Sequence, residues 1–197
     1  RHTASKMLVY PDGRITGSVG GGELENRVIA EAQQALKDGK ARILQYAMAD
    51  PARGDPGVCG GQVEVYVEPI LPKPTLLVIG AGHVGKAVVH LAHWLGYYVV
   101  VSDDRADLCS PETIPEADAY VPLPMAELPA QVEITPWTAI VLTTRGSDVD
   151  VIGLPALLNT PAGYIGLIGS RRRWEITRKQ LSEQGVEAVQ LGRVRSP

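Results

Sequence analysis

Three glycines after an apolar run have the types and spacing needed to hold a phosphate. The run Leu76–Ile79 leads into Gly80-Ala81-Gly82-His83-Val84-Gly85, which has the G-x-G-x-x-G pattern directly before an amphipathic segment. In this pattern the first glycine permits a tight turn, the second lets the backbone approach a pyrophosphate, and the third lets a helix pack closely on a sheet. Amides at the helix start then face the anion. The segment from Leu76 to Arg105 is therefore predicted to form the opening β-α-β unit of a Rossmann-type domain that binds a nucleotide-like ligand.

Two acids stand where the second strand of such a unit ends. Asp103 lies 23 positions after Gly80 and is followed by Asp104 and Arg105. An acid at this place accepts hydrogen bonds from ribose hydroxyls, whereas an arginine there pairs with a 2′-phosphate. Because both residue types are present, NAD and NADP remain open as ligands. A Rossmann domain that has kept its glycines but binds nothing is the alternative interpretation.

A second group of residues suited to an anion follows a later apolar run. The segment Gly169-Ser170-Arg171-Arg172-Arg173 comes after an expected strand, with Ser170 as the N-cap of the next helix. Three arginines in a first helical turn oppose the helix dipole, which favours a bound phosphate or an acidic partner surface. A solvated basic face is the alternative. Arg145 and Gly146 follow another strand at the same sheet edge, and we expect them to contact the ligand too.

Cys59 is the candidate for sulfur or metal chemistry. It lies in Gly57-Val58-Cys59-Gly60-Gly61, within the segment Asp50–Gly61, whose Gly, Pro and Asp content predicts an exposed loop. Glycines on both sides leave the thiol uncovered, so the sulfur can ligate a soft metal or carry a transferred sulfur atom. A small buried residue in a turn is the alternative.

The histidines and tryptophans give weaker signals. His90 and His93 lie three positions apart on an expected helix, but no third ligand is near in the sequence, so we predict no protein-ligated zinc. His83, at the phosphate-facing helix start, either touches the ligand or is a bystander in the loop. The tryptophans are expected to pack in the core or at its boundary: Trp94, Trp137 and Trp174.

The first 72 residues are expected to form a small α+β domain that carries the Cys59 loop. The elements expected in it are strands Lys6–Tyr10 and Arg14–Val19 around a turn, a helix from Leu24 to Gly39, and strands Ala41–Ala47 and Gln62–Pro69. Pro72 and Pro74 exclude a helix and give a stiff, extended connection. We therefore expect domains at 1–72 and 75–197.

From Thr75 onward, strand patterns alternate with helix patterns, which predicts a parallel sheet with covering helices. The expected fold class is α/β, a Rossmann-type parallel sheet domain preceded by the smaller α+β domain. On the helix Val84–Leu95, the larger apolar residues mark the face expected to pack on the sheet: Val84, Val88, Leu91 and Leu95. The other expected elements are strands Leu76–Ile79, Tyr97–Ser102, Ala139–Thr143 and Gly163–Gly169, helices Asp150–Leu158 and Arg172–Gln184, and a Pro-rich stretch Ser110–Pro129.

Composition argues against several classes of partner. The chain has 197 residues, of which 45% are hydrophobic and 21% charged, with a net charge of -3 and no apolar run long enough to cross a bilayer. Neither nucleic acid nor a membrane is therefore an expected partner. Two cysteines without a C-x-x-C pair fit a reducing, cytoplasmic setting. No export signal is visible, and we expect a fragment whose C-terminal end is truncated.

Several segments together resemble the XdhC/CoxI family, the accessory factors of xanthine dehydrogenase and related molybdenum hydroxylases. The resemblance covers nearly the whole chain. Its matching stretches are Met7-Leu8-Val9 with Asp12-Gly13, Gly17 to Gly22 with Leu24-Glu25, Val58 to Gly61 with Val63-Glu64-Val65, Gly80 to Gly85, Asp103 to Arg105, and Tyr164-Ile165-Gly166 with Ile168 to Arg172. Where the family commonly has a histidine after Thr-Arg-Gly, this chain has Ser147.

The resemblance implies a maturation chaperone rather than a turnover enzyme. Such proteins bind molybdenum cofactor (molybdopterin), protect it while a cysteine desulfurase supplies sulfur, and insert it into an apo molybdenum hydroxylase of the xanthine dehydrogenase type. By position, Cys59 would handle the sulfur or contact the molybdenum, and the two phosphate-binding segments suit the phosphate of this pterin. Apart from the resemblance, a homodimer is expected, because a small first domain on a stiff linker favours pairing or swapping.

Two other functions remain open. An NAD(P)-dependent oxidoreductase would use the same glycine loop, but no Tyr-x-x-x-Lys pair supplies a proton donor. A module that only senses a nucleotide would bind it without transfer or turnover.

Overall fold

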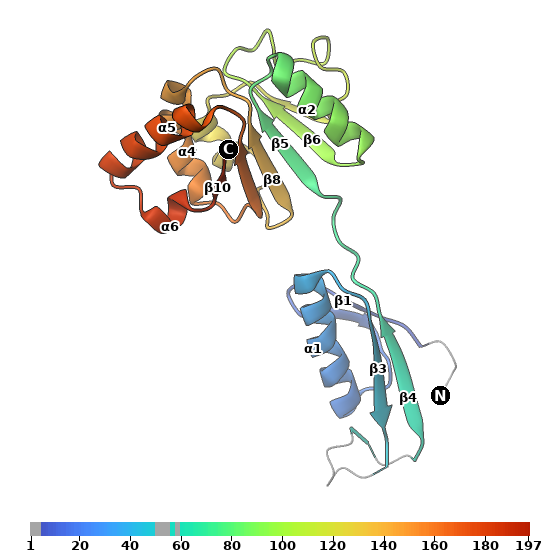
Figure 1. The fold of residues 1–197 in the computed structure, drawn as a ribbon. Coiled ribbons are helices and arrows are strands. Elements are labelled where there is room, and N and C mark those ends of the chain that lie inside the picture. The colour runs from blue at the N-terminus through green and yellow to red at the C-terminus, as the bar shows by residue number, and fades with distance from the viewer. Residues whose placement is uncertain (1–4, 50–55, 58–59) are drawn as a thin grey trace. The chain divides into compact units, whose positions relative to one another are not determined.

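The structure, a computed structural model, describes residues 5–49, 56–57 and 60–197. Figure 1 shows the chain with its helices and strands labelled. The chain forms two compact units, residues 1–71 and residues 72–197. Within the described ranges, no helix combines the length and the hydropathy of a membrane span.

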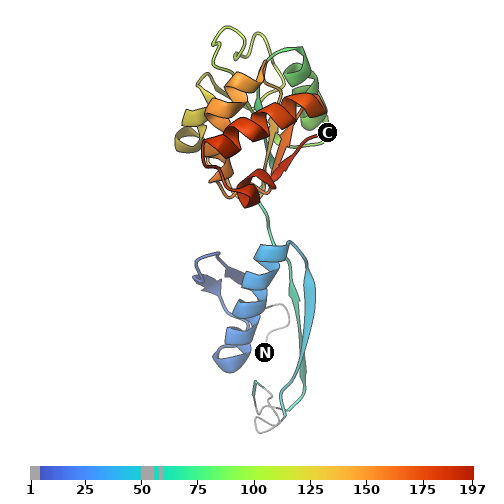
Figure 2. The same cartoon turned by 60° about the vertical axis from the view of Figure 1, so that its left-hand side comes forward.

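The first unit packs one helix against two pairs of antiparallel strands. Its elements are β1 (Met7–Val9), β2 (Ile15–Gly17), α1 (Gly22–Asp38), β3 (Arg42–Ala47) and β4 (Gln62–Val67). β1 pairs with β2 and β3 pairs with β4, and the two pairs form separate sheets. Leu24 and Val28 of α1 form a small core with Met48 and with inward-facing residues of the strands. Figure 2 shows α1 running alongside β3 and β4.

The second unit is a six-stranded parallel sheet with the strand order β10-β9-β8-β5-β6-β7, which confirms the expected α/β Rossmann-type fold. Its strands are β5 (Thr75–Ile79), β6 (Tyr98–Ser102), β7 (Ala119–Val121), β8 (Thr138–Leu142), β9 (Tyr164–Leu167) and β10 (Val194–Arg195). Its helices are α2 (His83–Trp94), the 3-10 turn η2 (Met125–Glu127), α3 (Leu128–Gln131), α4 (Ser147–Leu158), α5 (Arg171–Glu183) and α6 (Ala188–Leu191).

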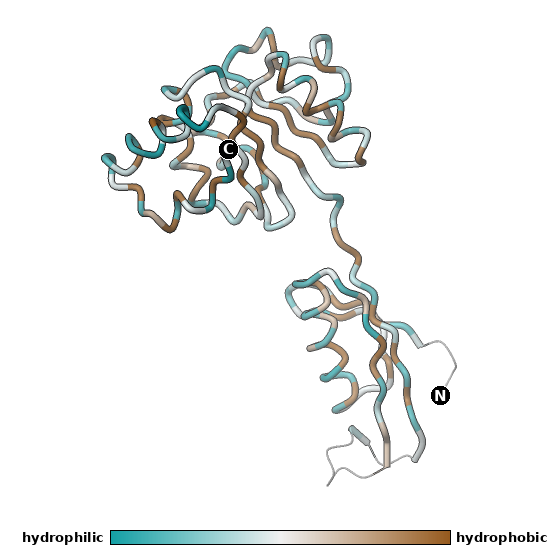
Figure 3. Tube along the Cα trace, in the orientation of Figure 1, coloured by the Kyte–Doolittle hydropathy of each residue, from teal (hydrophilic) through white to brown (hydrophobic). Residues whose placement is uncertain are grey.

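The sheet supplies two cores, one on each face. Because side chains alternate along a strand, Leu77 and Ile79 of β5 join the core beneath α4 and α5, whereas Val78 joins the core beneath α2. Figure 1 shows α2 on one side of the sheet and α4 and α5 on the other. The apolar residues are concentrated along the central strands (Figure 3).

Five short elements of this unit were not expected from the sequence pattern: β7, η2, α3, α6 and β10. β7, η2 and the start of α3 fall inside the stretch described above as Pro-rich, where Pro124 directly precedes η2 and Pro129 lies in α3. Elements of two to four residues are too short to show a period of their own. Their formation depends on packing against neighbouring elements, as η2 does against α4.

The face of α2 that packs on the sheet was predicted wrongly for Val84, Leu91 and Leu95, whereas the expected packing of Val88 is confirmed. The residues buried there are Gly85, Val89 and Ala92, whereas Val84, Leu91 and Leu95 are 51%, 55% and 56% exposed. The helix carries two apolar stripes, and the sequence pattern favoured the one with larger side chains. The contact between Gly85 and the Gly80 carbonyl decides the rotation, since only the small-residue stripe lets the helix approach so closely. Trp94, expected in the core or at its boundary, is 76% exposed.

Replacing Gly85 with alanine should destabilise the second unit. A Cβ atom at Gly85 would lie 1.8 Å from the Gly80 carbonyl oxygen, so the helix or the turn must shift. Overpacking of this kind costs about 1–3 kcal/mol of unfolding free energy, measurable by urea denaturation. Gly82→Ala is the matched control, because a Cβ there meets nothing within 4 Å. Equal losses for both variants would contradict the close packing at Gly85.

Candidate functional site

Residues expected to bind a ligand follow four neighbouring strands of the sheet. Gly80 to Gly85 follow β5, Asp103 to Arg105 follow β6, Arg145 and Gly146 follow β8, and Ser170 to Arg172 follow β9. All these strands are parallel, so the four segments lie at the same carboxyl edge. Ligands of open α/β sheets bind along this edge.

The glycine loop has the close backbone geometry that its spacing predicts. Gly80 has a φ of 109°, which favours glycine, and a Cβ there would lie 2.6 Å from the Thr143 carbonyl oxygen. The Thr143 hydroxyl donates a hydrogen bond to the Gly80 carbonyl at 2.6 Å and so ties the β8 loop to this turn. A Cβ at Gly82, in contrast, would meet nothing within 4 Å. This open space is what a glycine needs if it is to let a ligand approach the backbone.

The start of α2 is free to meet an anion. Gly82 is its N-cap, no side chain caps the helix, and no acid occupies the first turn. The first N–H groups of a helix lack acceptors within the helix and carry the positive end of its dipole. His83, the first residue of α2, is exposed beside them.

Asp103 is turned inward rather than toward a ligand. Its side chain is buried, and its carboxylate accepts hydrogen bonds from the Ala81 amide at 2.7 Å and from the Arg105 guanidinium at 2.8 Å. Burial alone would raise the pKa of Asp103, but the hydrogen bonds from Arg105 and Ala81 outweigh it and lower the pKa to about 2. Asp103 thus holds the glycine loop in place, and Arg105, expected near a 2′-phosphate, already donates to Asp103.

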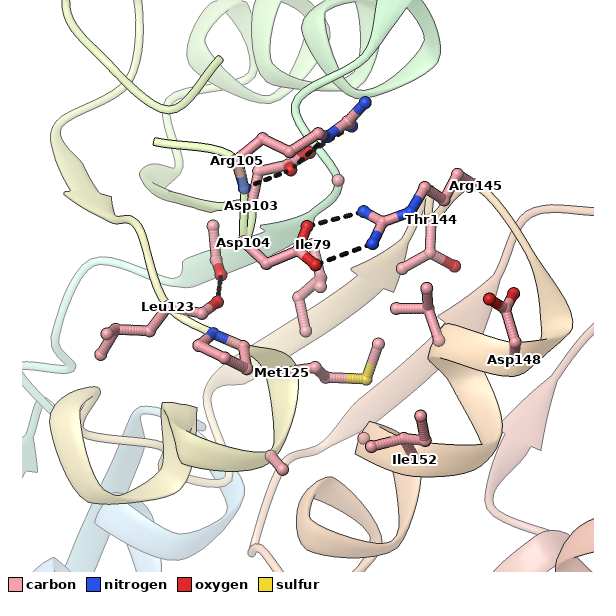
Figure 4. A pocket seen from close by; sticks show the side chains of 16 residues that line it. Ile79, Asp103, Asp104, Arg105, Leu123, Met125, Thr144, Arg145, Asp148 and Ile152 are labelled. Atoms are coloured by element: carbon pink, nitrogen blue, oxygen red, sulfur yellow. Dashed lines mark hydrogen bonds and ion pairs between the residues drawn. The ribbon is translucent and has the colours of Figure 1, made fainter. Parts of the chain in front are cut away.

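Asp104 and Arg145 form an ion pair at the edge of a cavity (Figure 4). The guanidinium of Arg145 donates to both carboxylate oxygens of Asp104, at 2.6 and 2.8 Å. These hydrogen bonds lower the pKa of Asp104 and raise the pKa of Arg145. Both side chains remain partly exposed, so a ligand can compete for them. Asp104 is therefore the acid at the end of β6 that a ribose or a polar ring can reach.

The cavity beside this ion pair has a volume of about 200 Å³. Its opposite wall is apolar and includes Leu123, Met125 and Ile152, which Figure 4 shows across from Asp104 and Arg145. Small-molecule sites commonly measure about 300–1,000 Å³, so this cavity holds one end of a ligand rather than all of it. The sequence did not reveal these three residues, because they come from the Pro-rich stretch and from a helix face that looks merely apolar.

Arg173 belongs to the interior, in contrast to the expectation that all three arginines after Ser170 meet an external anion. Its guanidinium donates to the fully buried carboxylate of Asp150 at 2.6 and 2.9 Å and to the Thr144 carbonyl at 2.9 Å. These contacts fasten α5 to α4 and to the β8 loop. Ser170 caps α5, as expected, by accepting the Arg173 amide hydrogen at 3.2 Å.

Arg171 and Arg172 are exposed at the start of α5, and neither forms an ion pair within the described part of the chain. Both therefore remain available to an anion. Gly146 is the N-cap of α4, and Ser147 is the first residue of that helix.

Cys59 lies outside the described residues. Cys109, the other cysteine, is buried, and burial raises the pKa of its thiol, so it is not a reactive nucleophile. His90 is paired with Glu116 at 2.7 Å. In the ranges that the structure describes, no three His, Cys, Asp or Glu side chains come together as a metal site.

Models of known families match both parts of this chain. The model described as the XdhC Rossmann domain matches residues 76–197, and the model described as the XdhC and CoxI family matches residues 1–47. Together they cover most of the chain.

Two curated proteins are similar in sequence. "Uncharacterized protein YqeB" of Escherichia coli (strain K12) is 34% identical over 201 residues, which is 100% of this chain and 36% of that protein. A probable xanthine dehydrogenase subunit of Bacillus subtilis (strain 168) is 30% identical over 109 residues, 55% of this chain and 33% of that protein. The chain thus spans about a third of the length of these relatives.

A solved structure, described as a xanthine dehydrogenase from Bacillus halodurans, has a similar fold. The TM-score is 0.51 at 21% sequence identity, and the match covers 93% of this chain and 77% of that one. At this identity the likeness concerns the fold.

Asp103→Asn should weaken the fold and reduce its acid sensitivity. The pKa of Asp103 is about 2 in the folded chain, against about 3.9 for an unperturbed aspartate. Its ionised form therefore contributes about 2 kcal/mol of stability at neutral pH, which is lost as the pH falls from about 4 toward 2. Urea unfolding at pH 7 and pH 3 measures about half of this loss in the wild type, because pH 3 lies midway between the two pKa values, and a smaller loss in the variant.

The matched control is Asp104→Asn, which removes the neighbouring, partly exposed carboxylate. Exposed ion pairs contribute about 0–1 kcal/mol, so this variant should stay within that range of the wild type. An Asp103→Asn variant as stable as Asp104→Asn would show that Asp103 does not hold the glycine loop.

Proposed function

This chain belongs to the XdhC and CoxI family, and we propose that it binds molybdenum cofactor as cargo and delivers it to a hydroxylase of the xanthine dehydrogenase type. One observation carries the proposal. The uncapped first turn of α2, the exposed arginines of α5 and a cavity with one polar and one apolar wall all belong to the carboxyl edge of one sheet.

The phosphate of the cofactor suits the glycine loop. The amides at the start of α2 have no side-chain cap, and no acid in the first turn repels an anion. Arg171 and Arg172 add positive charge at the start of α5, where the helix dipole also favours an anion. An anion at this edge would relieve the unfavourable position of two arginines at a helix N-terminus.

The pterin ring suits the cavity. Leu123, Met125 and Ile152 provide an apolar wall for a flat ring, and the Asp104–Arg145 pair provides acceptors and donors for its polar edge. A ring bound there would exchange one exposed ion pair for hydrogen bonds to the ligand. Because the cavity holds only one end of a ligand, the remainder of the cofactor stays accessible for transfer.

The finer steps follow from the family resemblance. Cys59 handles the sulfur that a cysteine desulfurase supplies, or contacts the molybdenum. The recipient is an apo molybdenum hydroxylase. Two further parts of the proposal rest on the sequence itself: the cytoplasmic setting on two cysteines without a C-x-x-C pair, and a homodimer on a small first domain with a stiff linker. The chain is a carrier in this scheme, which requires binding and release rather than turnover.

A second candidate is binding of a nicotinamide dinucleotide by an oxidoreductase. The observation that favours it is an acid, Asp104, at the end of the strand that follows the glycine-loop helix. In the described structure the neighbouring Asp103 and Arg105 are engaged with each other, which leaves one acid for a ribose.

Titrations of the purified chain separate the two functions. Isolated molybdenum cofactor, kept anaerobic, should quench the intrinsic fluorescence with a micromolar Kd, whereas NADH and NADPH should not bind in this range. Tight binding of NADH or NADPH together with no binding of molybdenum cofactor would replace the first function by the second.

Removing the two exposed arginines should weaken cofactor binding. The double variant Arg171→Ala, Arg172→Ala loses two positive charges at the sheet edge that holds the proposed phosphate site, after the second strand from the glycine loop. We expect about a 10-fold higher Kd, equivalent to about 1.4 kcal/mol. The double variant Arg178→Ala, Lys179→Ala removes the same charge from a later turn of α5 and is the matched control. A loss that is equal in both variants would indicate only a general charge effect.

A further inference from the structure

The first unit contains a groove of about 1030 Å³ that the proposed function does not use. One wall is formed by residues 5–11, which include β1, and the other by residues 62–70, which include β4. Its floor includes Val28, Ala32 and Leu36 of α1, which follow one another at four-residue spacing. The groove is called the β1–β4 groove below.

Both walls of the β1–β4 groove are strand edges. β1 pairs only with β2 and β4 pairs only with β3 within the described residues, and the two pairs form separate sheets. Consecutive residues of both strands line the groove. Since successive side chains point to opposite faces, a groove over a face would be lined by every second residue. The groove therefore runs along the two edges, where backbone N–H and C=O groups point into it.

The floor selects for apolar groups. Val28 is buried, and inward-facing residues of the neighbouring strands, among them Met7 and Val65, pack on the same side of α1. An occupant must therefore offer hydrogen-bonding groups to both edges and apolar groups to the helix. An extended polypeptide strand with alternate apolar side chains has both properties. A helix does not, because its backbone groups are bonded internally.

We propose that the β1–β4 groove is a binding site for one extended polypeptide strand, which joins β3–β4 and β1–β2 into a single sheet over α1. The wall of residues 62–70 matches a strand of about seven to nine residues, or about 23–30 Å. The strand comes from another segment of the same protein, outside the 197 residues of this chain. The inference is independent of the cofactor function.

The length of the relatives supports an occupant from the same protein. This chain accounts for 36% of the Escherichia coli relative and for 77% of the Bacillus halodurans chain of similar fold, so both have further polypeptide. Edge pairing depends on the backbone and tolerates many sequences, and covalent linkage supplies the high effective concentration that such pairing needs. A second copy fits less well, because each strand described here is already paired within its own unit.

The test uses the 197-residue chain and a set of overlapping 12-residue peptides that cover the Escherichia coli relative outside the matched region. Fluorescence anisotropy measures binding, and hydrogen exchange locates it. Peptides from one stretch with alternate apolar residues should bind and slow amide exchange at least about 10-fold in β1 and β4, with exchange in α2 unchanged.

Ala32→Trp fills the floor of the β1–β4 groove and should raise the peptide Kd at least about 10-fold. Ala30→Trp makes the same substitution at an exposed position of α1 and is the matched control. If Ala32→Trp does not fold by circular dichroism, Leu36→Lys replaces it, because it places a charge on the same floor.

Several outcomes would overturn the proposal. No peptide of the set binds, or binding is unaffected by the groove variants, or protection appears away from β1 and β4. Self-association that Ala32→Trp abolishes would assign the groove to a second copy. Equal binding of peptides from an unrelated protein would assign it to foreign partners. None of these results tests the binding of molybdenum cofactor, which is measured separately and is proposed to occur at the second unit.

Discussion

The second unit depends on a backbone approach so close that no side chain fits in it. Gly85 of α2 lies against the Gly80 carbonyl, and the Asp103 carboxylate holds the Ala81 amide between them. This contact sets the rotation of α2 and directs its first amides outward at the sheet edge. It also leaves Val84 and Leu91 of α2 exposed, because the small-residue stripe must face the sheet. The geometry of the proposed phosphate site and the unusual surface of α2 thus have one cause.

Burial divides the charged groups of the sheet edge into two kinds. The buried carboxylates Asp103 and Asp150 are each matched by an arginine, Arg105 and Arg173, and these pairs hold loops and helices together. A buried charge must be paired, and such pairs are costly to break. The Asp104–Arg145 pair and the two arginines after Ser170 are exposed, so an incoming ligand can bind them at little cost. The proposed carrier function uses only groups of the second kind.

Local pattern in the sequence predicted much of the fold. The G-x-G-x-x-G spacing, the strand–helix alternation and the Ser170 cap all depend on near neighbours, and the structure contains each of them. Two pairings that the sequence did not reveal join residues far apart in the chain. The pairing of Asp150 with Arg173 spans 23 positions, and the Asp104–Arg145 pair spans 41. The apolar wall at Met125 can be predicted only if β7 and η2 are predicted first. Both elements are too short to show a periodic pattern in the sequence. The Cys59 loop lies outside the described residues, so its assignment remains a prediction.

We propose that a phosphorylated pterin binds at the start of α2. The most direct measurement is a two-dimensional amide NMR titration of the 21.1 kDa chain with molybdenum cofactor. The largest shifts should appear at the amides of Gly82, His83 and Val84, with further shifts at Asp104 and Arg145. If the cofactor binds while the signals of these amides do not shift and the changes lie elsewhere, or if it does not bind, the start of α2 is not the phosphate site.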